Sequence, residues 1–219
     1  MNLLIIGAPG AGKGSMSKHI VEDYEIAHIS TGDILRQAIH DETPVGLKAK
    51  EYMDAGNLVP DSIIHDIIVE RLKQDDIQKG FLFDGYPRTY AQAVDFTNIL
   101  NELNKKIDAV IDLDISDDVL MKRITGRRLC PKCGEIYNIY TKTPKTEGIC
   151  DVCNSELITR KDDNAESLTV RLEEYHKNTE PLIAYYEKMD VVKKINADQN
   201  DIDEYNDIKS ILEGLKWFR

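Results

Sequence analysis

The chain begins with a short apolar segment, a glycine-rich loop and a helical segment, in that order. Asn2–Ile6 is predicted to form a buried strand, the loop reads GAPGAGKG over residues 7–14, and Lys13–Asp23 is predicted to form a helix. Glycines let the backbone turn tightly and expose its N–H groups, and the positive end of the following helix attracts anions. Lys13 adds a mobile positive charge for the outer phosphates. The pattern therefore predicts a site for the phosphates of a nucleotide.

The residue after this lysine departs from the general phosphate loop. That pattern has Ser or Thr directly after the lysine, whereas this chain has Gly14 followed by Ser15, whose hydroxyl can help to hold magnesium or phosphate. A chance glycine-rich turn is the alternative interpretation. The register of strand, loop, lysine and helix argues against that alternative.

The rest of the chain alternates strands with helices, which is typical of an α/β protein with a mainly parallel sheet covered by helices on both faces. Later strands are predicted near Ala27–Ile29 and at Phe81–Phe83, Ala109–Leu113 and Val191–Ile195. Predicted helices are Asp33–His40, Val45–Asp54, Asp61–Lys73, Asp117–Thr125 with Ser116 as N-cap, Glu166–Met189 with a kink or break at Pro181, and Asp201–Trp217. The pattern is interrupted between Arg127 and Asn164, a segment that we interpret as an inserted minidomain.

Charge limits the classes of ligand. The 39 acidic and 28 basic residues give a net charge of −11, which argues against broad nucleic-acid binding because such binding neutralises many phosphates with Lys and Arg. A small anion would require local clusters of the nine arginines. No apolar run approaches the roughly 20 residues that span a bilayer, and no signal peptide is evident. We therefore expect a cytoplasmic protein without a membrane partner.

All four cysteines lie in the interrupted segment. Cys130-Pro131-Lys132-Cys133 and Cys150-Asp151-Val152-Cys153 form two Cys-x-x-Cys pairs, a spacing typical of tetrahedral Zn²⁺ bound by four thiolates. Four protein ligands leave no open position, so such a zinc would be structural rather than catalytic. Disulfides and inert free thiols are the alternatives; a cytosolic location disfavours the first and the paired spacing disfavours the second.

Further motifs occur in order along the chain. They read STGDILR at 30–36, NLVPD at 57–61, GFLFDGYPRT at 80–89, RITGRR at 123–128 and TRKDD at 159–163. Taken alone, the first would be a helix start with Thr31 as a possible cap and Asp33 complementing the helix dipole. In the third, a buried strand delivers Asp84 to the carboxyl edge of the sheet, where ligands bind in open α/β folds, and Arg88 can bind a phosphate with two hydrogen bonds.

Together with Gly-Lys-Gly-Ser, these motifs resemble the adenylate kinase family, in the long-lid, zinc-binding form common in bacteria. The resemblance covers the chain from Met1 to about Leu212. It implies reversible transfer of the terminal phosphoryl group from Mg²⁺-bound ATP to AMP, giving two ADP by direct in-line transfer and maintaining the balance of adenine nucleotides. For the fold it implies a phosphate-loop core with a five-stranded parallel sheet. The core would comprise residues 1–29, 60–126 and 165–219, with an AMP-binding insertion at 30–59 and a zinc-binding lid at 127–164.

The resemblance also assigns residues to the two nucleotides. On the ATP side it implies Gly10, Ala11, Gly12, Lys13, Gly14, Ser15, Arg123, Arg127, Ile136, Tyr137 and Gln199. On the AMP side it implies Thr31, Arg36, Asn57, Leu58, Val59, Gly85, Tyr86, Pro87, Arg88, Gln92, Arg160 and Arg171, with Gln92 recognising the base. The catalytic set is Lys13, Asp84, Arg88, Arg123, Arg127, Arg160 and Arg171, and Asp84 suits water-mediated binding of Mg²⁺.

Several positions depart from the usual family pattern. Met16 stands where the family has Gln, Tyr86 where it has Phe, and Asn196-Ala197 where it commonly has Asp-Gly. Asp162 and Asp163 are interpreted either as partners of lid arginines or as helix caps. We expect a monomer that binds ATP, AMP and ADP.

Two other functions remain open from the sequence. One is a kinase for a different nucleoside monophosphate, or one that uses GTP as donor. The other is a zinc-ribbon binding module fused to a regulatory ATPase, although Cys130–Cys153 contains three lysines and no arginine.

Overall fold

A computed structural model describes residues 1–216 of the chain. The final residues Trp217, Phe218 and Arg219, for which the sequence suggests no role, lie outside the described residues. None of the helices formed by residues 1–216 combines the length and the apolar character that a membrane crossing needs.

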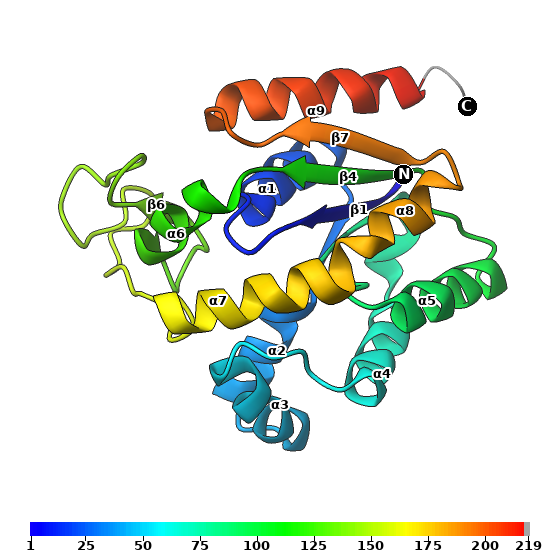
Figure 1. The fold of residues 1–219 in the computed structure, drawn as a ribbon, viewed down its shortest axis with the longest axis horizontal. Helices are drawn as coiled ribbons and strands as arrows, with labels where there is room; N and C mark the ends of the chain where they lie inside the picture. Colours follow the sequence, from blue (N-terminus) through cyan, green and yellow to red (C-terminus); the bar gives the residue numbers. More distant parts are fainter. Residues whose placement is uncertain (217–219) are drawn as a thin grey trace.

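The centre of the molecule is a parallel sheet of five strands, ordered β2-β3-β1-β4-β7 (Figure 1). The strands are β1 (Asn2–Gly7), β2 (Ala27–Ser30), β3 (Phe81–Asp84), β4 (Ala109–Asp114) and β7 (Val192–Asn196), and every neighbouring pair is parallel. The α/β fold with a five-stranded parallel sheet is therefore confirmed. Because all strands point the same way, the segments that follow β1, β2 and β3 meet at one edge.

Alternating apolar side chains of the strands form two cores. On β1, Leu3 and Ile5 belong to the core beneath α1 (Lys13–Tyr24) and α9 (Asp201–Lys216), whereas Leu4 and Ile6 belong to the opposite one. The opposite core is closed by α4 (Asp61–Arg71), α5 (Tyr90–Glu102) and α8 (Pro181–Glu187). Burial on both faces explains why the three central strands, β1, β3 and β4, are mostly apolar.

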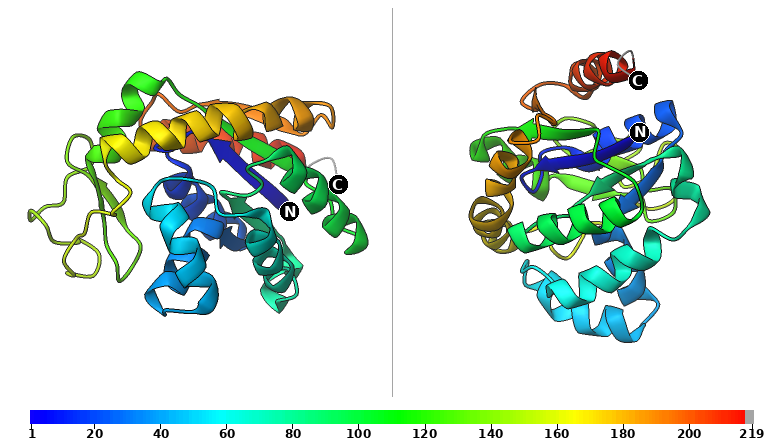
Figure 2. Two further views of the ribbon diagram at one scale, coloured as in Figure 1. Left: turned by 60° about the horizontal axis from the view of Figure 1, so that its bottom comes forward. Right: turned by 90° about the vertical axis from the view of Figure 1, so that its right-hand side faces the viewer.

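Residues 30–59 contain two short helices beside the main sheet, α2 (Thr31–His40) and α3 (Pro44–Asp54) (Figure 2). Ser30, not Thr31, caps α2, because its side chain accepts a hydrogen bond from the Asp33 N–H at 3.3 Å. The suggestion of Thr31 as the cap was wrong by one residue, since Thr31 already has helical geometry and its hydroxyl has another partner.

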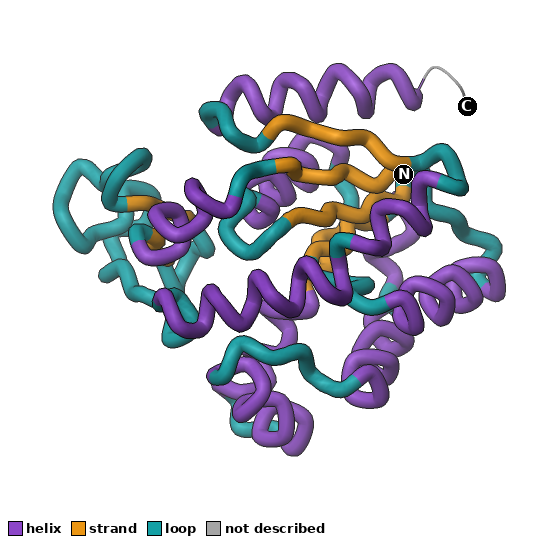
Figure 3. Tube along the Cα trace, viewed as in Figure 1, coloured by secondary structure: helices purple, strands orange, loops and turns teal. Residues whose placement is uncertain are grey.

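Residues 127–164, here called the lid segment, consist mainly of loops (Figure 3). Two three-residue strands, β5 (Arg127–Leu129) and β6 (Ile136–Asn138), pair antiparallel near its base. The segment therefore has little regular structure of its own, as its mixture of Cys, Thr, Pro and Gly predicts.

The long helix predicted for Glu166–Met189 is divided into three parts. They are α7 (Ala165–Glu174), one π-helical turn at Tyr175–Thr179, and α8, which starts at Pro181. Proline lacks the N–H that a continuous helix would use, so the break lies just before it. The hydroxyl of Thr179 donates to the carbonyl of Arg88 at 3.0 Å and joins this turn to the segment after β3.

Three helical elements complete the fold. Helix α6 (Asp117–Thr125) starts after Ser116 as expected, but the Ser116 side chain makes no capping hydrogen bond. Helix α5 and a 3-10 turn at Asp75–Lys79 were not assigned from the sequence. Thr89 caps α5 by accepting from the Gln92 N–H at 3.2 Å, and this Thr-x-x-Gln pattern could have revealed the helix.

Candidate functional site

A cavity of about 1690 Å³ opens at the carboxyl edge of the sheet. It is lined by the segments that follow β1, β2 and β3, by α7 and by the lid segment. Pockets for one small ligand commonly measure about 300–1000 Å³. The cavity therefore has room for more than one ligand of that size.

The floor of the cavity is the glycine-rich loop. Gly10 has φ 91° and Gly12 has φ 104°, backbone conformations that favour glycine, and α1 begins at Lys13. The ammonium of Lys13 donates to the carbonyls of Gly7 at 2.7 Å and Ala8 at 3.0 Å. The loop therefore presents backbone N–H groups, the positive end of a helix and a lysine on one side of the cavity.

Burial disfavours the charged form of Lys13 and lowers its pKa to about 8. Arg88, Arg171 and Arg127 lower the pKa further by repulsion, and Asp84 opposes them. The protein therefore places several positive charges together without an equal number of negative ones. Such a site favours a strongly anionic ligand.

Six arginines from distant parts of the sequence line this cavity; they are Arg36, Arg88, Arg123, Arg127, Arg160 and Arg171. Burial is the main cause that lowers the pKa of Arg160 and of Arg171 to about 10. Taking these guanidinium groups partly out of water strengthens their attraction for an anion. The local charge is thus opposite to the net charge of −11 of the whole chain.

Acidic residues hold several of these arginines in place. Arg127 makes two hydrogen bonds to the buried carboxylate of Asp163, one of them at 2.8 Å. Arg171 donates to the carboxylate of Asp162 at 3.1 Å. The two aspartates therefore pair with arginines, and Asn164 caps α7 instead.

Asp33 connects α2 to the lid segment. Its carboxylate accepts from Arg36 at 2.5 Å and lies 3.6 Å from Nη2 of Arg160, so one acidic side chain joins α2 to the end of the lid segment. These pairs hold the guanidinium groups of Arg36 and Arg160 close to each other at the cavity.

The lid segment also contacts the phosphate loop directly. A methyl group placed on Gly14 would lie 3.4 Å from Cδ1 of Ile136, an ordinary van der Waals distance, so Ile136 lies next to this loop. Lys18 of α1 pairs with Glu135, which also accepts from Lys142 at 2.8 Å. The cavity is therefore covered from the lid side.

The residues after β3 form another wall. Asp84 lies at the carboxyl end of the strand, with Oδ2 4.0 Å from Nε2 of His28. Nε of Arg88 donates to the carbonyl of Gly85 at 2.8 Å, and Thr31 donates to the same carbonyl at 2.8 Å. One carbonyl thus aligns the segment after β3 with the start of α2.

Gln92 is held by protein groups. Its side-chain oxygen accepts from the backbone N–H of Arg88 at 2.7 Å, and its amide nitrogen donates to Asp61 at 2.6 Å. Tyr86 packs edge-on against Phe96, with ring centroids 5.3 Å apart, and is buried. Gln92 therefore supports the wall from behind, whereas Tyr86 also lines the cavity.

Arg123 connects the loop to the end of β7. Its guanidinium donates to the carbonyl of Ala11 at 3.3 Å and to that of Ala197 at 2.8 Å. Ala197 is fully buried, and its N–H donates to the Asp114 carbonyl at 2.8 Å. Gln199, two residues further along, donates to Asp207 at 2.9 Å.

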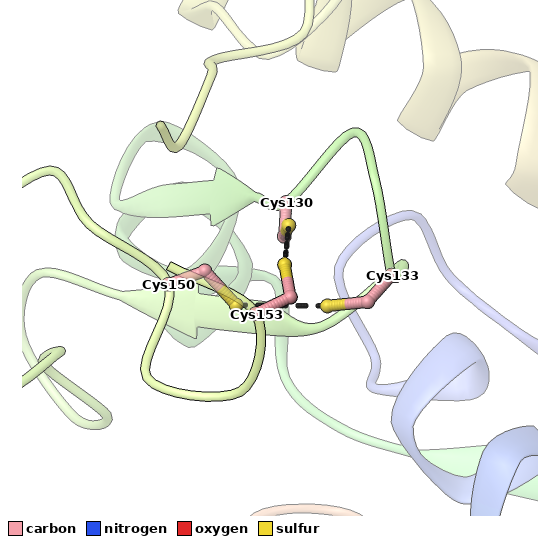
Figure 4. Close-up of side chains that lie close together, drawn as sticks. All are labelled: Cys130, Cys133, Cys150 and Cys153. Carbon is pink, nitrogen blue, oxygen red and sulfur yellow. Dashed lines mark hydrogen bonds between the residues drawn. The ribbon is translucent and has the colours of Figure 1, made fainter. Parts of the chain in front are cut away.

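The four cysteines come together at one point in the lid segment (Figure 4). All are free, and their four Sγ atoms lie within 4.8 Å of one another. Sγ of Cys130 lies 3.3 Å from that of Cys153, and Sγ of Cys133 lies 3.5 Å from that of Cys150. These separations exceed a disulfide bond of about 2.05 Å but allow all four atoms to reach one ion. The cluster is a possible metal site.

Tyr137 belongs to the interior of the lid segment. Its ring is buried, its hydroxyl lies 3.6 Å from Sγ of Cys150, and it accepts from the Asp151 N–H at 2.8 Å. Its side chain therefore supports the cysteine cluster.

Most of the residues selected from the sequence line one cavity. Besides the six arginines, they are Gly10, Gly12, Lys13, Gly14, Ser15, Leu58, Asp84, Gly85, Tyr86, Pro87, Ile136, Tyr137 and Gln199. Five others are not part of this lining: Ala11, Thr31, Val59 and Gln92 are buried, and Asn57 is exposed.

Sequence reasoning missed the positioning role of Asp33 and did not select His28 or Glu204. Asp33 lies in the first turn of α2, where an acidic residue is expected for helix stability alone, so the sequence gives no sign of its pairing with Arg160. Glu204 has a detectable signal: it precedes Ile208 and Leu212 by four and eight residues, so it lies on the apolar face of α9.

Comparisons with known proteins agree with this geometry. The family model for adenylate kinase matches residues 5–191. The chain is 51% identical over 216 residues to an adenylate kinase of Geobacillus sp. strain WCH70, covering 99% of this chain and 100% of the relative. It is 50% identical to one of Bacillus subtilis strain 168 (99% and 100% covered) and 49% identical to one of Thermodesulfovibrio yellowstonii (97% and 99%).

Proposed function

The chain belongs to the adenylate kinase family, and we propose that it transfers the terminal phosphoryl group of Mg²⁺-bound ATP directly to AMP, giving two ADP. Such a reaction maintains the balance of adenine nucleotides. The observation that carries this assignment is one cavity in which a phosphate loop and six arginines from several segments converge. Phosphoryl transfer needs positioning and positive charge more than covalent chemistry by the protein.

The donor ATP is assigned to the glycine-rich loop. Backbone N–H groups between Gly10 and Ser15 would bind the β- and γ-phosphates, and Lys13 would neutralise charge as it moves during transfer. Arg123 and Gln199 border the cavity beside this loop and are assigned to the adenosine end, with Ile136 above Gly14. The lid would thereby exclude water and limit hydrolysis of ATP.

The acceptor AMP is assigned to the wall formed by α2 and the segment after β3. Arg36 and Arg88 would bind the phosphate of AMP. Thr31 and Gln92 would support this wall through their present hydrogen bonds, or would contact the adenine base after exchanging those protein partners for AMP. Arg127, Arg160 and Arg171 would then lie where the transferred group passes between the two nucleotides. Their charge would stabilise the equatorial oxygens in the transition state.

The two inserted segments are proposed as mobile units on a fixed core. Residues 30–59 would be the AMP-binding insertion, residues 127–164 the lid, and the remaining residues the core. The Asp33–Arg160 and Lys18–Glu135 pairs support this division, since each joins two of the proposed units. Such pairs would form on closure and break on product release.

Magnesium fits the donor set of this cavity. Asp84 and Ser15 offer a carboxylate and a hydroxyl, the hard oxygen ligands that Mg²⁺ prefers, and both line the cavity. When bound, Mg²⁺ would supply positive charge that neutralises the phosphates. Asp84 would act through water molecules of the ion.

Zinc fits the cysteine cluster. Four sulfur ligands in two Cys-x-x-Cys pairs favour Zn²⁺, which binds thiolates at about 2.3 Å in a tetrahedron. Because all four positions would be protein ligands, the ion would have a structural role. We further propose that the enzyme works as a cytoplasmic monomer, without nucleic-acid or membrane partners, where its nucleotide substrates are found.

A test of the function measures acceptor preference. Purified protein is mixed with Mg²⁺-bound ATP and with AMP, UMP, CMP or GMP in turn, and diphosphate formation is followed. We expect rapid ADP production when AMP is the acceptor and not when UMP, CMP or GMP takes its place. A preference for another monophosphate, or ATP consumption that does not depend on an acceptor, would overturn the assignment.

Removal of zinc should destabilise the lid before it affects chemistry. We expect about one zinc per chain by elemental analysis, and we expect Cys150→Ser or chelation to lower Tm by about 5–10 °C. The physical reason is that the lid segment has only a small buried cluster, formed by Cys130, Tyr137 and Cys150, so the metal would supply much of what holds its loops together. Thr146→Ala, which removes an exposed hydroxyl from the same segment, is the matched control and should keep both zinc and Tm. An unchanged Tm in the zinc-free protein would contradict a structural role.

A further inference from the structure

Glu204 is a buried acidic side chain that the proposed reaction does not use. It lies on α9 and is 1% exposed, and its Oε1 has no hydrogen-bond partner within residues 1–216. Burying a carboxyl group without a partner is costly, and the cost is much greater for the charged form. The surroundings of this carboxyl group therefore favour its neutral, protonated form.

The carboxyl group lies against the phosphate loop. A methyl group placed on Gly12 would lie 3.5 Å from Oε1 and 3.7 Å from Oε2 of Glu204. The same point is 3.8 Å from Nη1 of Arg123. Glu204 and Arg123 thus approach Gly12 together, yet the Arg123 guanidinium donates to the carbonyls of Ala11 and Ala197.

Few charged groups act on Glu204. Burial raises its pKa to about 8; Arg123 opposes the rise and Asp201 of the same helix adds to it. Glu22 of α1 and Lys193 of β7 also lie on elements packed against α9, but neither is among the groups that shift the pKa of Glu204. Three further charged groups on these elements have partners of their own. Asp23 of α1 pairs with Lys209, Lys194 of β7 pairs with Asp114, and His19 of α1 stacks on Tyr205.

We propose that Glu204 is a positioning residue of the ATP site: in its neutral form it leaves the loop and Arg123 arranged for ATP, and in its ionised form it opposes ATP binding. The ionised carboxylate would attract Arg123 away from the carbonyls of Ala11 and Ala197. It would also place a negative charge directly behind the N–H groups that face the phosphates. The inference rests on the proposed function, because it takes ATP as the ligand of this loop.

The sign of the pH effect follows from linkage. Bound phosphates are anionic and favour the protonated form of Glu204, so ATP binding takes up a proton when Glu204 is ionised in the free protein. Affinity is therefore highest below the pKa of about 8 and falls as the pH rises through it. Lys13, whose pKa is lowered to about 8, changes affinity in the same direction. Only a comparison between variants separates the two groups.

The experiment measures the Kd of ATP by calorimetry without AMP, at pH 7.5 to about 9.5, where the charge of ATP is constant. The wild type is compared with Glu204→Gln, with Glu204→Met, which removes the titrating group without an amide, and with Glu213→Gln, an exposed control on the same helix. We expect the ratio of wild-type Kd to the Kd of either Glu204 variant to rise about five- to tenfold over this range. Wild type and Glu213→Gln should also take up more protons than the Glu204 variants, measured in buffers of different ionisation enthalpy. In assays, the KM for ATP should carry the effect, with kcat and the KM for AMP showing little of it.

A ratio that stays constant with pH would overturn the inference, because it would mean that Glu204 acts only on structure. The same conclusion follows if all four proteins take up equal numbers of protons. Failure of the proposed function is distinguishable: wild type would then not bind ATP at pH 7.5.

Discussion

Replacing Lys13 with methionine is expected to lower kcat about a thousandfold, equivalent to about 4 kcal/mol of transition-state stabilisation. The ammonium is held on the carbonyls of Gly7 and Ala8 at the floor of the cavity, and methionine keeps the length of the side chain while removing its charge. Charge that moves onto the leaving β-phosphate oxygen would then lose one of the cations beside it. Steady-state and single-turnover kinetics with Mg²⁺-bound ATP and AMP measure the loss.

Lys106→Met is the matched control for this substitution. Lys106 is exposed and lies outside the cavity, so its loss should change kcat by less than about twofold. Thermal unfolding of both variants separates lost chemistry from lost structure. If the Lys13 variant folds normally and retains more than a tenth of wild-type kcat, the assigned role is wrong.

The charge of Lys13 also predicts a pH dependence. Its pKa is lowered to about 8 by burial, so the free enzyme carries the required charge below that pH and loses it above. We expect kcat/KM for ATP to fall as the pH rises through about 8, since this ratio reports groups of the free enzyme.

Replacing Arg88 with alanine is expected to lower kcat/KM for AMP by a factor of about 100 to 1000, roughly 3–4 kcal/mol. Nε of Arg88 is held by the Gly85 carbonyl, which fixes the plane of the guanidinium at the cavity wall. Two parallel hydrogen bonds to a phosphate depend on that plane. Arg88→Lys keeps the charge but loses the planar fork, so we expect only partial recovery.

Arg71→Ala supplies the comparison for Arg88. Arg71 pairs with Asp76 at the end of α4, outside the cavity, and its loss should affect stability slightly and AMP kinetics not at all. Measuring kcat and KM with AMP varied and ATP saturating separates acceptor binding from transfer. Equal AMP kinetics for the Arg88 and Arg71 variants would rule out the role proposed for Arg88.

Short-range patterns carried most of the fold prediction. The strands β1 and β3 contain continuous apolar runs, β4 is apolar apart from its two aspartates, and the glycine-rich loop and the Cys-x-x-Cys pairs each span only a few residues. The structure that each of these features forms depends on the spacing of neighbouring residues, so it can be predicted without knowing the rest of the chain. Helix α5 was missed although its Thr89–Gln92 capping pattern is equally local.

Contacts between distant segments could not be predicted from such short-range patterns. The pairing of Asp33 with Arg160 joins α2 to the lid segment, and the choice of Asp162 and Asp163 as arginine partners depends on where α7 lies. Tyr137 lines the cavity, as the resemblance implies, and the structure adds that its hydroxyl lies 3.6 Å from Sγ of Cys150. Each outcome depends on which side of a segment is buried, and several burial patterns were compatible with the sequence.

The sequence by itself determined that this protein has a phosphate loop, a four-cysteine cluster and a parallel α/β core. These features follow from backbone conformations and ligand spacings within a few residues. Only the tertiary structure decided which charges face one another, and it brought Glu204 behind Gly12 and gathered six arginines in one cavity. The physical reason is that a buried charge is governed by the groups packed around it, and those groups come from helices and strands far apart in the chain.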